Sequence, residues 1–127
     1  MTIYGIKNCS TVAKARRFMR ENGIEFDFVD YKVESVGKEQ VRRWAEQIDI
    51  DKLFNNRGKK YRDLGLKKLE LDRDGKIEWM ARENYLLKRP VIEYGNDEAL
   101  VSYDEDLYRE IFLEMETSVP NNESEAS

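Results

Sequence analysis

The pattern of apolar and polar residues in the first part of the chain predicts a strand, a helix and a second strand. Residues 2–6 are mostly β-branched or aromatic, which is typical of a strand. In residues 11–22 the apolar side chains recur at helical spacing, and the Asn22-Gly23 pair is a common helix stop. Residues 24–31 then alternate between apolar and acidic positions. Strand, helix and strand joined by short loops form a βαβ unit, so we expect the two strands to be parallel.

The middle of the chain, from about residue 36 to 87, has helical rather than strand periodicity. Apolar residues from Lys38 to Ile48 form one stripe of a helix. Shorter helical segments are predicted at residues 51–58, 61–71 and 77–87. Between the last two, the sequence Asp72-Arg73-Asp74-Gly75 is typical of a turn, because Asp and Gly favour turn conformations.

The last part of the chain predicts a hairpin and a final helix. Pro90 begins a short strand, where the missing N–H of proline is tolerated. Residues 95–98 turn the chain, and residues 99–103 return as the partner strand. A helix follows from Asp104, with acidic residues at its N-terminus. We therefore expect one domain at residues 1–116, with a helical insertion at about 36–87, and a disordered Ser-, Glu- and Asn-rich tail at 117–127.

Composition narrows the class of protein. Hydrophobic residues make up 40% and charged residues 38% of 127 residues, as in a soluble single-domain protein. The net charge of −4 argues against direct nucleic-acid binding through a basic surface. No apolar run approaches the roughly 20 residues that span a bilayer. The N-terminus opens directly into a strand pattern and the chain has one cysteine, so we expect no signal peptide and a cytoplasmic protein.

The absence of histidine excludes several kinds of chemistry. The chain has no histidine, so it has neither the commonest general base nor a Cys–His nucleophile pair. One cysteine and no histidine also leave too few ligands for a tetrahedral zinc site. We therefore expect no metal cofactor.

Cys9 is the residue most suited to chemistry. It lies between the first predicted strand and the N-terminus of the first predicted helix. Free N–H groups and the positive end of the helix dipole favour a thiolate at such a position. Lys7 and Lys14 add positive charge nearby. The alternative is an inert cysteine packed as a small hydrophobic residue, but Cys9 falls at the turn and outside the apolar stripe.

The order of elements looks like an α/β thioredoxin or glutaredoxin fold with a helical insertion. Four motifs are distinctive: Tyr-Gly-Ile-Lys-Asn-Cys at 4–9, Asn-Arg-Gly at 56–58, Leu-Gly-Leu at 64–66 and Lys-Arg-Pro-Val at 88–91. Together they resemble the motifs of the arsenate-reductase-like (ArsC) family over residues 2–116, and most of all those of its glutathione-linked branch. The Spx-type transcriptional regulators form another branch.

The resemblance implies roles for individual residues. It makes Cys9 the nucleophile, and it matches Arg57 and Arg89 to arginines that help to bind the oxyanion in arsenate reductases. It matches Pro90 to a cis-proline that lies against the active cysteine. Judged from the residues alone, an arginine suits an oxyanion or a carboxylate, but it also suits an ordinary surface ion pair.

The sequence also departs from the family pattern. Arsenate reductases of this family have a histidine where this chain has Gly5 and an arginine where it has Ala13. Their third oxyanion arginine corresponds to the stretch 100–103, which contains no cation. Lys7 and Lys14 supply charge without the bidentate geometry of arginine. Arsenate is therefore a doubtful natural substrate, and the absence of a second thiol near Cys9 excludes the Cys-x-x-Cys switch of Spx-type regulators.

Three functions remain open at this point. The first is a single-cysteine thiol oxidoreductase that uses glutathione as co-substrate. The carboxylates of glutathione would pair with Lys7, Arg57 or Arg89, and glutathione or a glutaredoxin would be the partner. The second is a regulator that docks on RNA polymerase through the helix at 11–22 and the insertion. The third is a family member without a redox role.

Overall fold

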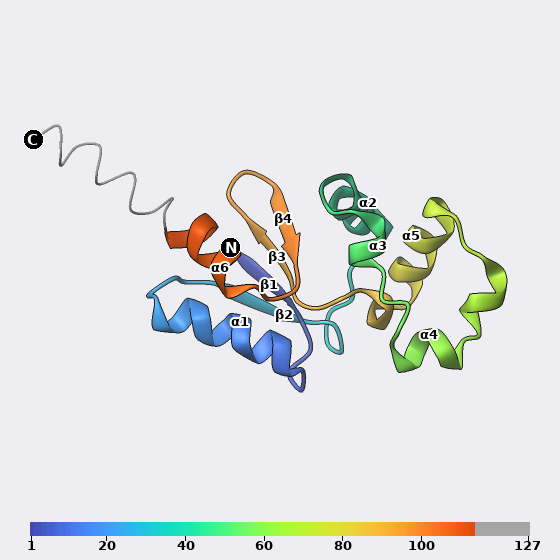
Figure 1. Ribbon diagram of the computed structural model, residues 1–127, viewed down its shortest axis with the longest axis horizontal. Helices are drawn as coiled ribbons and strands as arrows, with labels where there is room; N and C mark the ends of the chain where they lie inside the picture. Colours follow the sequence, from blue (N-terminus) through green and yellow to red (C-terminus); the bar gives the residue numbers. More distant parts are fainter. Residues whose placement is uncertain (114–127) are drawn as a thin grey trace, which may run out of the picture.

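The described part of the protein, residues 1–113 of a computed structural model, is built on a four-stranded mixed sheet (Figure 1). The strands lie in the order β2-β1-β3-β4, with β1 parallel to β2 and the other two pairs antiparallel. This arrangement confirms the predicted βαβ unit, the hairpin and the thioredoxin-like fold. The elements of this part are β1 (Thr2–Gly5), α1 (Ser10–Glu21), β2 (Asp27–Asp30), β3 (Val91–Tyr94), β4 (Glu98–Val101) and α6 (Glu105–Tyr108), which continues as a π-helical turn (Arg109–Leu113).

The connection from β2 to β3 is a run of short helices, which we call the helical segment (residues 38–86). Figure 1 shows it beside the sheet, on the side away from α1 and α6. Its elements are α2 (Lys38–Gln47), α3 (Ile50–Leu53), α4 (Lys59–Asp63), a 3₁₀ turn (Leu66–Leu69), α5 (Arg73–Arg82) and a second 3₁₀ turn (Asn84–Leu86).

The two faces of the sheet bury different side chains, because successive residues of a strand point to opposite faces. Ile3, Ile92 and Leu100 are paired across β1, β3 and β4, and they pack with α1 and α6. Tyr4 and Val91 are paired on the opposite face, and they pack with the helical segment. The sheet therefore lies between two hydrophobic clusters.

A polar network fixes α2 to the sheet. The carboxylate of Glu93 on β3 accepts hydrogen bonds from the Tyr4 hydroxyl (3.0 Å), the Gln40 amide (3.0 Å) and the Trp44 indole N–H (2.7 Å). Gln40 also donates to the Tyr4 hydroxyl at 2.9 Å. These bonds join α2 to β1 and β3, so they hold the helical segment in a defined position against the sheet.

An isolated antiparallel bridge closes the helical segment at its base. Phe54 pairs with Leu87, outside the main sheet. The N–H of Asn55 donates to the carbonyl of Leu86 at 2.7 Å, and the N–H of Lys88 donates to the last carbonyl of α3 at 2.8 Å. The bridge therefore joins two segments of the chain that are more than 30 residues apart in sequence.

Three predictions for the helical segment are wrong in detail. The predicted turn at 72–75 is the start of α5, because the Asp72 side chain caps the helix and accepts the N–H of Gly75 at 2.8 Å. The predicted helix at 61–71 is interrupted by Gly65, whose φ of +64° is a left-handed conformation. The predicted helix at 77–87 begins earlier and ends at Arg82.

The described residues also bear on membranes and metals. No helix within residues 1–113 is long and apolar enough to cross a membrane. In the same range, no three His, Cys, Asp or Glu side chains gather as a metal site would require. The predicted tail at 117–127 and the last turn of the predicted final helix lie outside the described residues.

Candidate active site at Cys9

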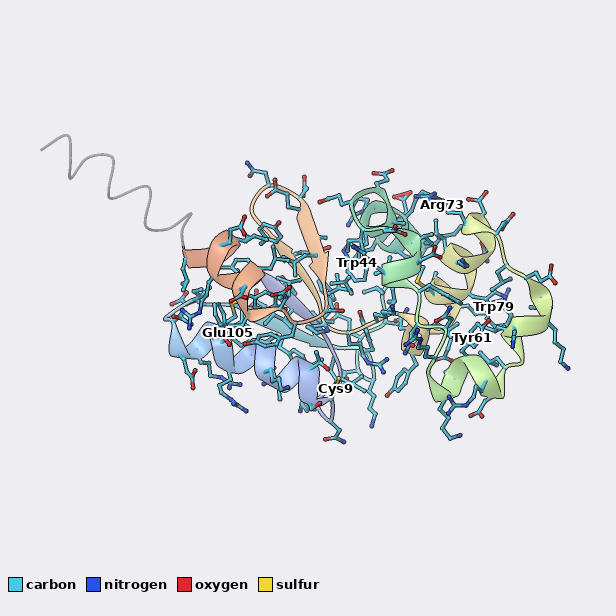
Figure 2. The ribbon with its side chains drawn as sticks, in the orientation of Figure 1. Cys9, Trp44, Tyr61, Arg73, Trp79 and Glu105 are labelled. Atoms are coloured by element: carbon cyan, nitrogen blue, oxygen red, sulfur yellow. The ribbon has the colours of Figure 1, made fainter. Side chains whose placement is uncertain are left out.

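Cys9 is the N-cap residue of α1. Its backbone is extended, and its carbonyl accepts the N–H of Ala13 at 2.9 Å, the first hydrogen bond of the helix. The helix begins at Ser10, one residue earlier than the sequence predicts, so the cap is Cys9 itself. Figure 2 shows Cys9 at the end of α1 that faces the helical segment. The sulfur therefore lies at the positive end of the helix dipole.

Several groups act on the pKa of the Cys9 thiol. Burial raises it, but the N–H of Val12, the hydroxyl and N–H of Thr11, and the charge of Arg89 together outweigh burial and lower this pKa below its ordinary value. The neutral thiol makes no regular side-chain cap hydrogen bond, because sulfur is a weak acceptor. The same donors favour the charged thiolate, so Cys9 has the surroundings of a reactive cysteine.

Cys9 opens into a cleft of about 260 Å³. The start of α1 contributes Cys9 and Thr11, and the end of β4 contributes Ser102. The remaining lining residues are Asn55, Lys88 and Arg89, which come from the two chain segments at the base of the helical segment. The cleft thus has a nucleophile, two cations, three neutral polar side chains and no acidic side chain.

Arg89 is held in place by the chain segment just before it. Its Nη1 donates to the carbonyls of Tyr85 (3.2 Å) and Leu87 (3.4 Å), and its guanidinium lies 5.5 Å from the centre of the Tyr85 ring. Among residues 1–113, no carboxylate forms an ion pair with it. The Arg89–Pro90 peptide bond is cis, as predicted. The other guanidinium nitrogens are therefore available to an anion.

Arg89 also lies near Tyr31, a buried residue just after β2. The Tyr31 hydroxyl has no hydrogen-bond partner among residues 1–113. Burial raises the pKa of Tyr31 far above its ordinary range, while the charge of Arg89 opposes this effect. Tyr31 is therefore neutral, and the positive charge of Arg89 is not cancelled there.

Ser102 closes the cleft from the end of β4. Its φ of +76° is unusual for a residue with a side chain. Its N–H donates to the carbonyl of Pro90 at 2.8 Å, and its carbonyl accepts the Tyr108 hydroxyl at 2.6 Å. Bonds on both sides hold this conformation, which belongs to the stretch where arsenate reductases have their third arginine.

The structure brings together only some of the residues that the sequence singles out. Cys9 and Arg89 line the same cleft, whereas the exposed residues Lys7, Lys14 and Arg57 do not line it. Their roles in anion binding stay predictions. Sequence reasoning missed Asn55 and Lys88, although each is a near neighbour of a predicted arginine, because nothing local indicates the bridge that places them beside Cys9.

Gly5, at the end of β1, allows this strand to pack closely on α1. A Cβ atom at this position would lie 2.7 Å from a methyl carbon of Val12, which is far inside van der Waals contact. Val12 is itself fully buried. Where arsenate reductases of the family have a histidine, this chain therefore has no room for a side chain unless Val12 moves.

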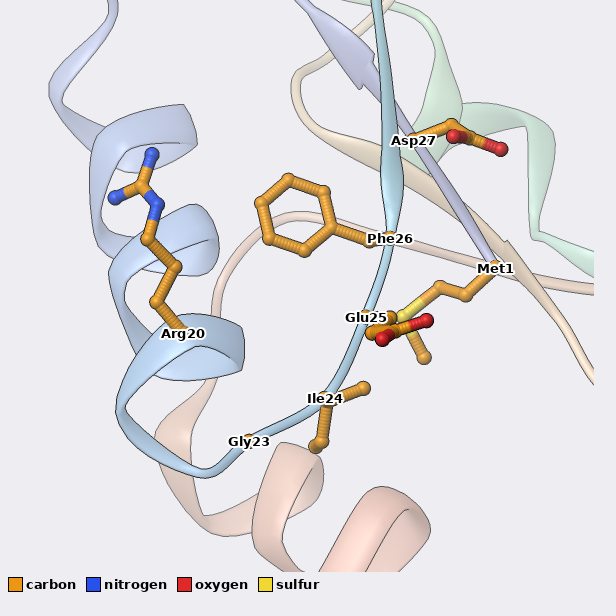
Figure 3. A pocket seen from close by; sticks show the side chains of 7 residues that line it. All are labelled: Met1, Arg20, Gly23, Ile24, Glu25, Phe26 and Asp27. Carbon is orange, nitrogen blue, oxygen red and sulfur yellow. The ribbon is translucent and has the colours of Figure 1, made fainter.

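A second hollow, of about 690 Å³ and so larger than the Cys9 cleft, lies at the other end of α1 (Figure 3). In Figure 3 the ring of Phe26 lies between Arg20 on one side and the carboxylates of Glu25 and Asp27 on the other. The residues that line it carry no thiol or hydroxyl side chain. The Cys9 cleft is therefore the better candidate for chemistry.

Comparison with known proteins gives consistent matches over most of the chain. The model of the ArsC family matches residues 4–111. The solved structure of a protein named YFFB is 35% identical, covers 86% of this chain and 96% of its own, and superposes with a TM-score of 0.80.

Two further relatives have similar coverage. The solution structure of an arsenate reductase (ArsC) related protein from Brucella melitensis is 33% identical, covers 87% of this chain and 92% of its own, and has a TM-score of 0.67. The uncharacterized protein YusI of Bacillus subtilis is 31% identical over an alignment of 114 residues, and the match covers 87% of this chain and 96% of YusI.

Proposed function

The chain belongs to the ArsC family and is arsenate reductase-like, and on this premise we propose that it is a thiol oxidoreductase with one active cysteine and glutathione as co-substrate. The observation that carries the proposal is Cys9 itself. Its sulfur sits at a helix N-terminus, with a lowered pKa, in a cleft that holds Arg89 and no acidic side chain. Glutathione, or a glutaredoxin acting with it, is the proposed partner.

The proposed reaction is two successive thiol–disulfide exchanges. The Cys9 thiolate attacks the glutathione sulfur of a mixed disulfide, the old S–S bond breaks, and the substrate leaves as a thiolate that takes up a proton. A second glutathione, as its thiolate, then attacks the glutathione sulfur on Cys9. This step releases oxidised glutathione and restores the Cys9 thiolate. The outside thiol is required because the chain has no second cysteine to resolve the adduct.

We further propose that arsenate is a poor substrate. Lys88 and Arg89 are the cations that line the cleft, and Gly5 is packed too tightly to be replaced by a residue with a donor. Each missing charge-assisted hydrogen bond lowers the affinity for an oxyanion by about 1.5–3 kcal/mol, or roughly one to two powers of ten. Either of the two carboxylates of glutathione needs fewer donors than an arsenate ion.

The test is to incubate the reduced protein with oxidised glutathione and to weigh it by intact mass spectrometry. We expect one glutathione adduct, which reduced glutathione removes. Cys9→Ser should form none, and Arg89→Ala should form it more slowly. Arg42→Ala, which removes an exposed cation of α2 outside the cleft, is the matched control and should behave as wild type.

Two outcomes would contradict the proposal. Absence of an adduct together with rapid arsenate reduction would overturn the choice of substrate. Absence of both would favour the regulator that docks on RNA polymerase, which a pull-down with the polymerase then tests.

A further inference from the structure

Asn55 and Lys88 follow the two residues of the Phe54–Leu87 bridge, and both line the Cys9 cleft. We propose that these two side chains form a carboxylate-binding subsite, so that the cleft prefers thiols and disulfides with a carboxylate over neutral ones. The inference rests on the proposed function, because it names the class of substrate for the same cysteine. It assigns substrate recognition to Asn55 and Lys88, and thiol activation to the start of α1 together with Arg89.

The charge of Lys88 is only weakly compensated by the groups around it. It is half-buried, and its Nζ contacts the carbonyl of Asp51 at a long 3.4 Å. The carboxylate of Asp51 is engaged by Lys76 at 3.1 Å. Within residues 1–113, no carboxylate forms an ion pair with Lys88. An ammonium group has three donors, so most of its capacity remains for an anion in the cleft.

Asn55 presents donors because its acceptor is already in use. Its Oδ1 accepts the N–H of Arg57 at 3.2 Å, and this bond sets the orientation of the amide. Its backbone N–H is bonded to Leu86, so the residue is fixed to the bridge. A Cβ atom at position 58 would lie 2.8 Å from the Asn55 amide nitrogen, so Gly58 leaves space for this amide. The remaining NH₂ group donates, as an acceptor-only carboxylate requires.

The subsite is separate from the groups that activate the thiol. The charge that lowers the pKa of Cys9 comes from Arg89, together with donors of Thr11 and Val12. Removing the charge of Lys88 should therefore weaken recognition of an anion more than it changes the fraction of Cys9 that is thiolate. This separation gives an experiment that does not depend on glutathione.

The experiment compares alkylation of Cys9 by iodoacetate, which carries a carboxylate, and by iodoacetamide, which is neutral and of nearly the same shape. We expect Lys88→Gln to lower the ratio of the iodoacetate rate to the iodoacetamide rate by about three- to tenfold. Asn55→Ala should lower it by a smaller factor, and Lys88→Arg should preserve it. The iodoacetamide rate should fall much less than the iodoacetate rate in Lys88→Gln.

The matched control is Lys52→Gln, which removes the same charge from an exposed position on α3 outside the cleft. A ratio that stays at the wild-type value in Lys88→Gln, or that falls equally in Lys52→Gln, overturns the subsite. If the rate ratio falls in Lys88→Gln but not in Lys52→Gln, and the wild-type protein forms no glutathione adduct, the subsite is supported and the proposed co-substrate is overturned. The two failures can therefore be told apart.

Discussion

Replacing Glu93 by glutamine should loosen the helical segment from the sheet. The carboxylate accepts three hydrogen bonds, from Tyr4, Gln40 and Trp44. A glutamine has one oxygen, and its NH₂ group must face one of these donors. At least one bond to a charged acceptor is lost, which costs about 1.5–3 kcal/mol. Because the network is only partly buried, we expect a loss near the lower end, about 2 kcal/mol in the free energy of unfolding.

Urea denaturation measures this loss, followed by circular dichroism and tryptophan fluorescence. Glu39→Gln, at an exposed position of α2, should change the unfolding free energy by less than about 0.5 kcal/mol. In a double-mutant cycle with Trp44→Phe, the loss from Glu93→Gln should be smaller, because one of the opposing donors is then absent. If Glu93→Gln unfolds at the same urea concentration as wild type, the network does not hold α2 to the sheet.

Two further predictions concern the surroundings of Cys9. Gly5→Ala should destabilise the protein by about 1–3 kcal/mol, because its new methyl group overlaps Val12. Thermal unfolding measures this loss. When Gly5→Ala is combined with Val12→Ala, the loss of unfolding free energy should be smaller than the sum of the losses from the single changes. The pH profile of Cys9 alkylation by iodoacetamide should have its midpoint below that of a free thiol, since the pKa is lowered. Thr11→Val should move it to higher pH and Thr11→Ser should not; an unmoved profile in Thr11→Val would remove the role of the hydroxyl.

The strands and α1 could be predicted because local patterns determine them. Residues 2–6 and the hairpin after Pro90 have clear strand composition, and they form β1, β3 and β4. A turn was wrongly predicted at 72–75 because an aspartate followed by a glycine three residues later is typical of both a turn and a helix N-cap. The choice depends on whether the following residues can be buried, and Ile77 and Met80 are buried against the rest of the helical segment.

The candidate site was predicted only where its residues are unusual in themselves. Cys9 is the sole cysteine, and Arg89 precedes the cis-proline. Asn55 and Lys88 carry no such local signal. They line the cleft because the pairing of Phe54 with Leu87 brings distant segments together. The family resemblance pointed to the arginine at 57, whereas the structure places the asparagine two residues before it in the cleft.

The bridge between Phe54 and Leu87 also bears on how the chain folds. The pairing of β1 with β3 joins residues such as Tyr4 and Glu93, whose separation of 89 residues makes the sheet slow to close. If residues 54–87 condense first, the bridge joins their ends and removes about a third of this loop from the search. Because the entropic cost of closure depends on the logarithm of loop length, this lowers the cost by about 0.4 kcal/mol, or roughly a twofold gain in rate. The bridge that places Asn55 and Lys88 in the Cys9 cleft thus also shortens the loop that must close when β1 pairs with β3.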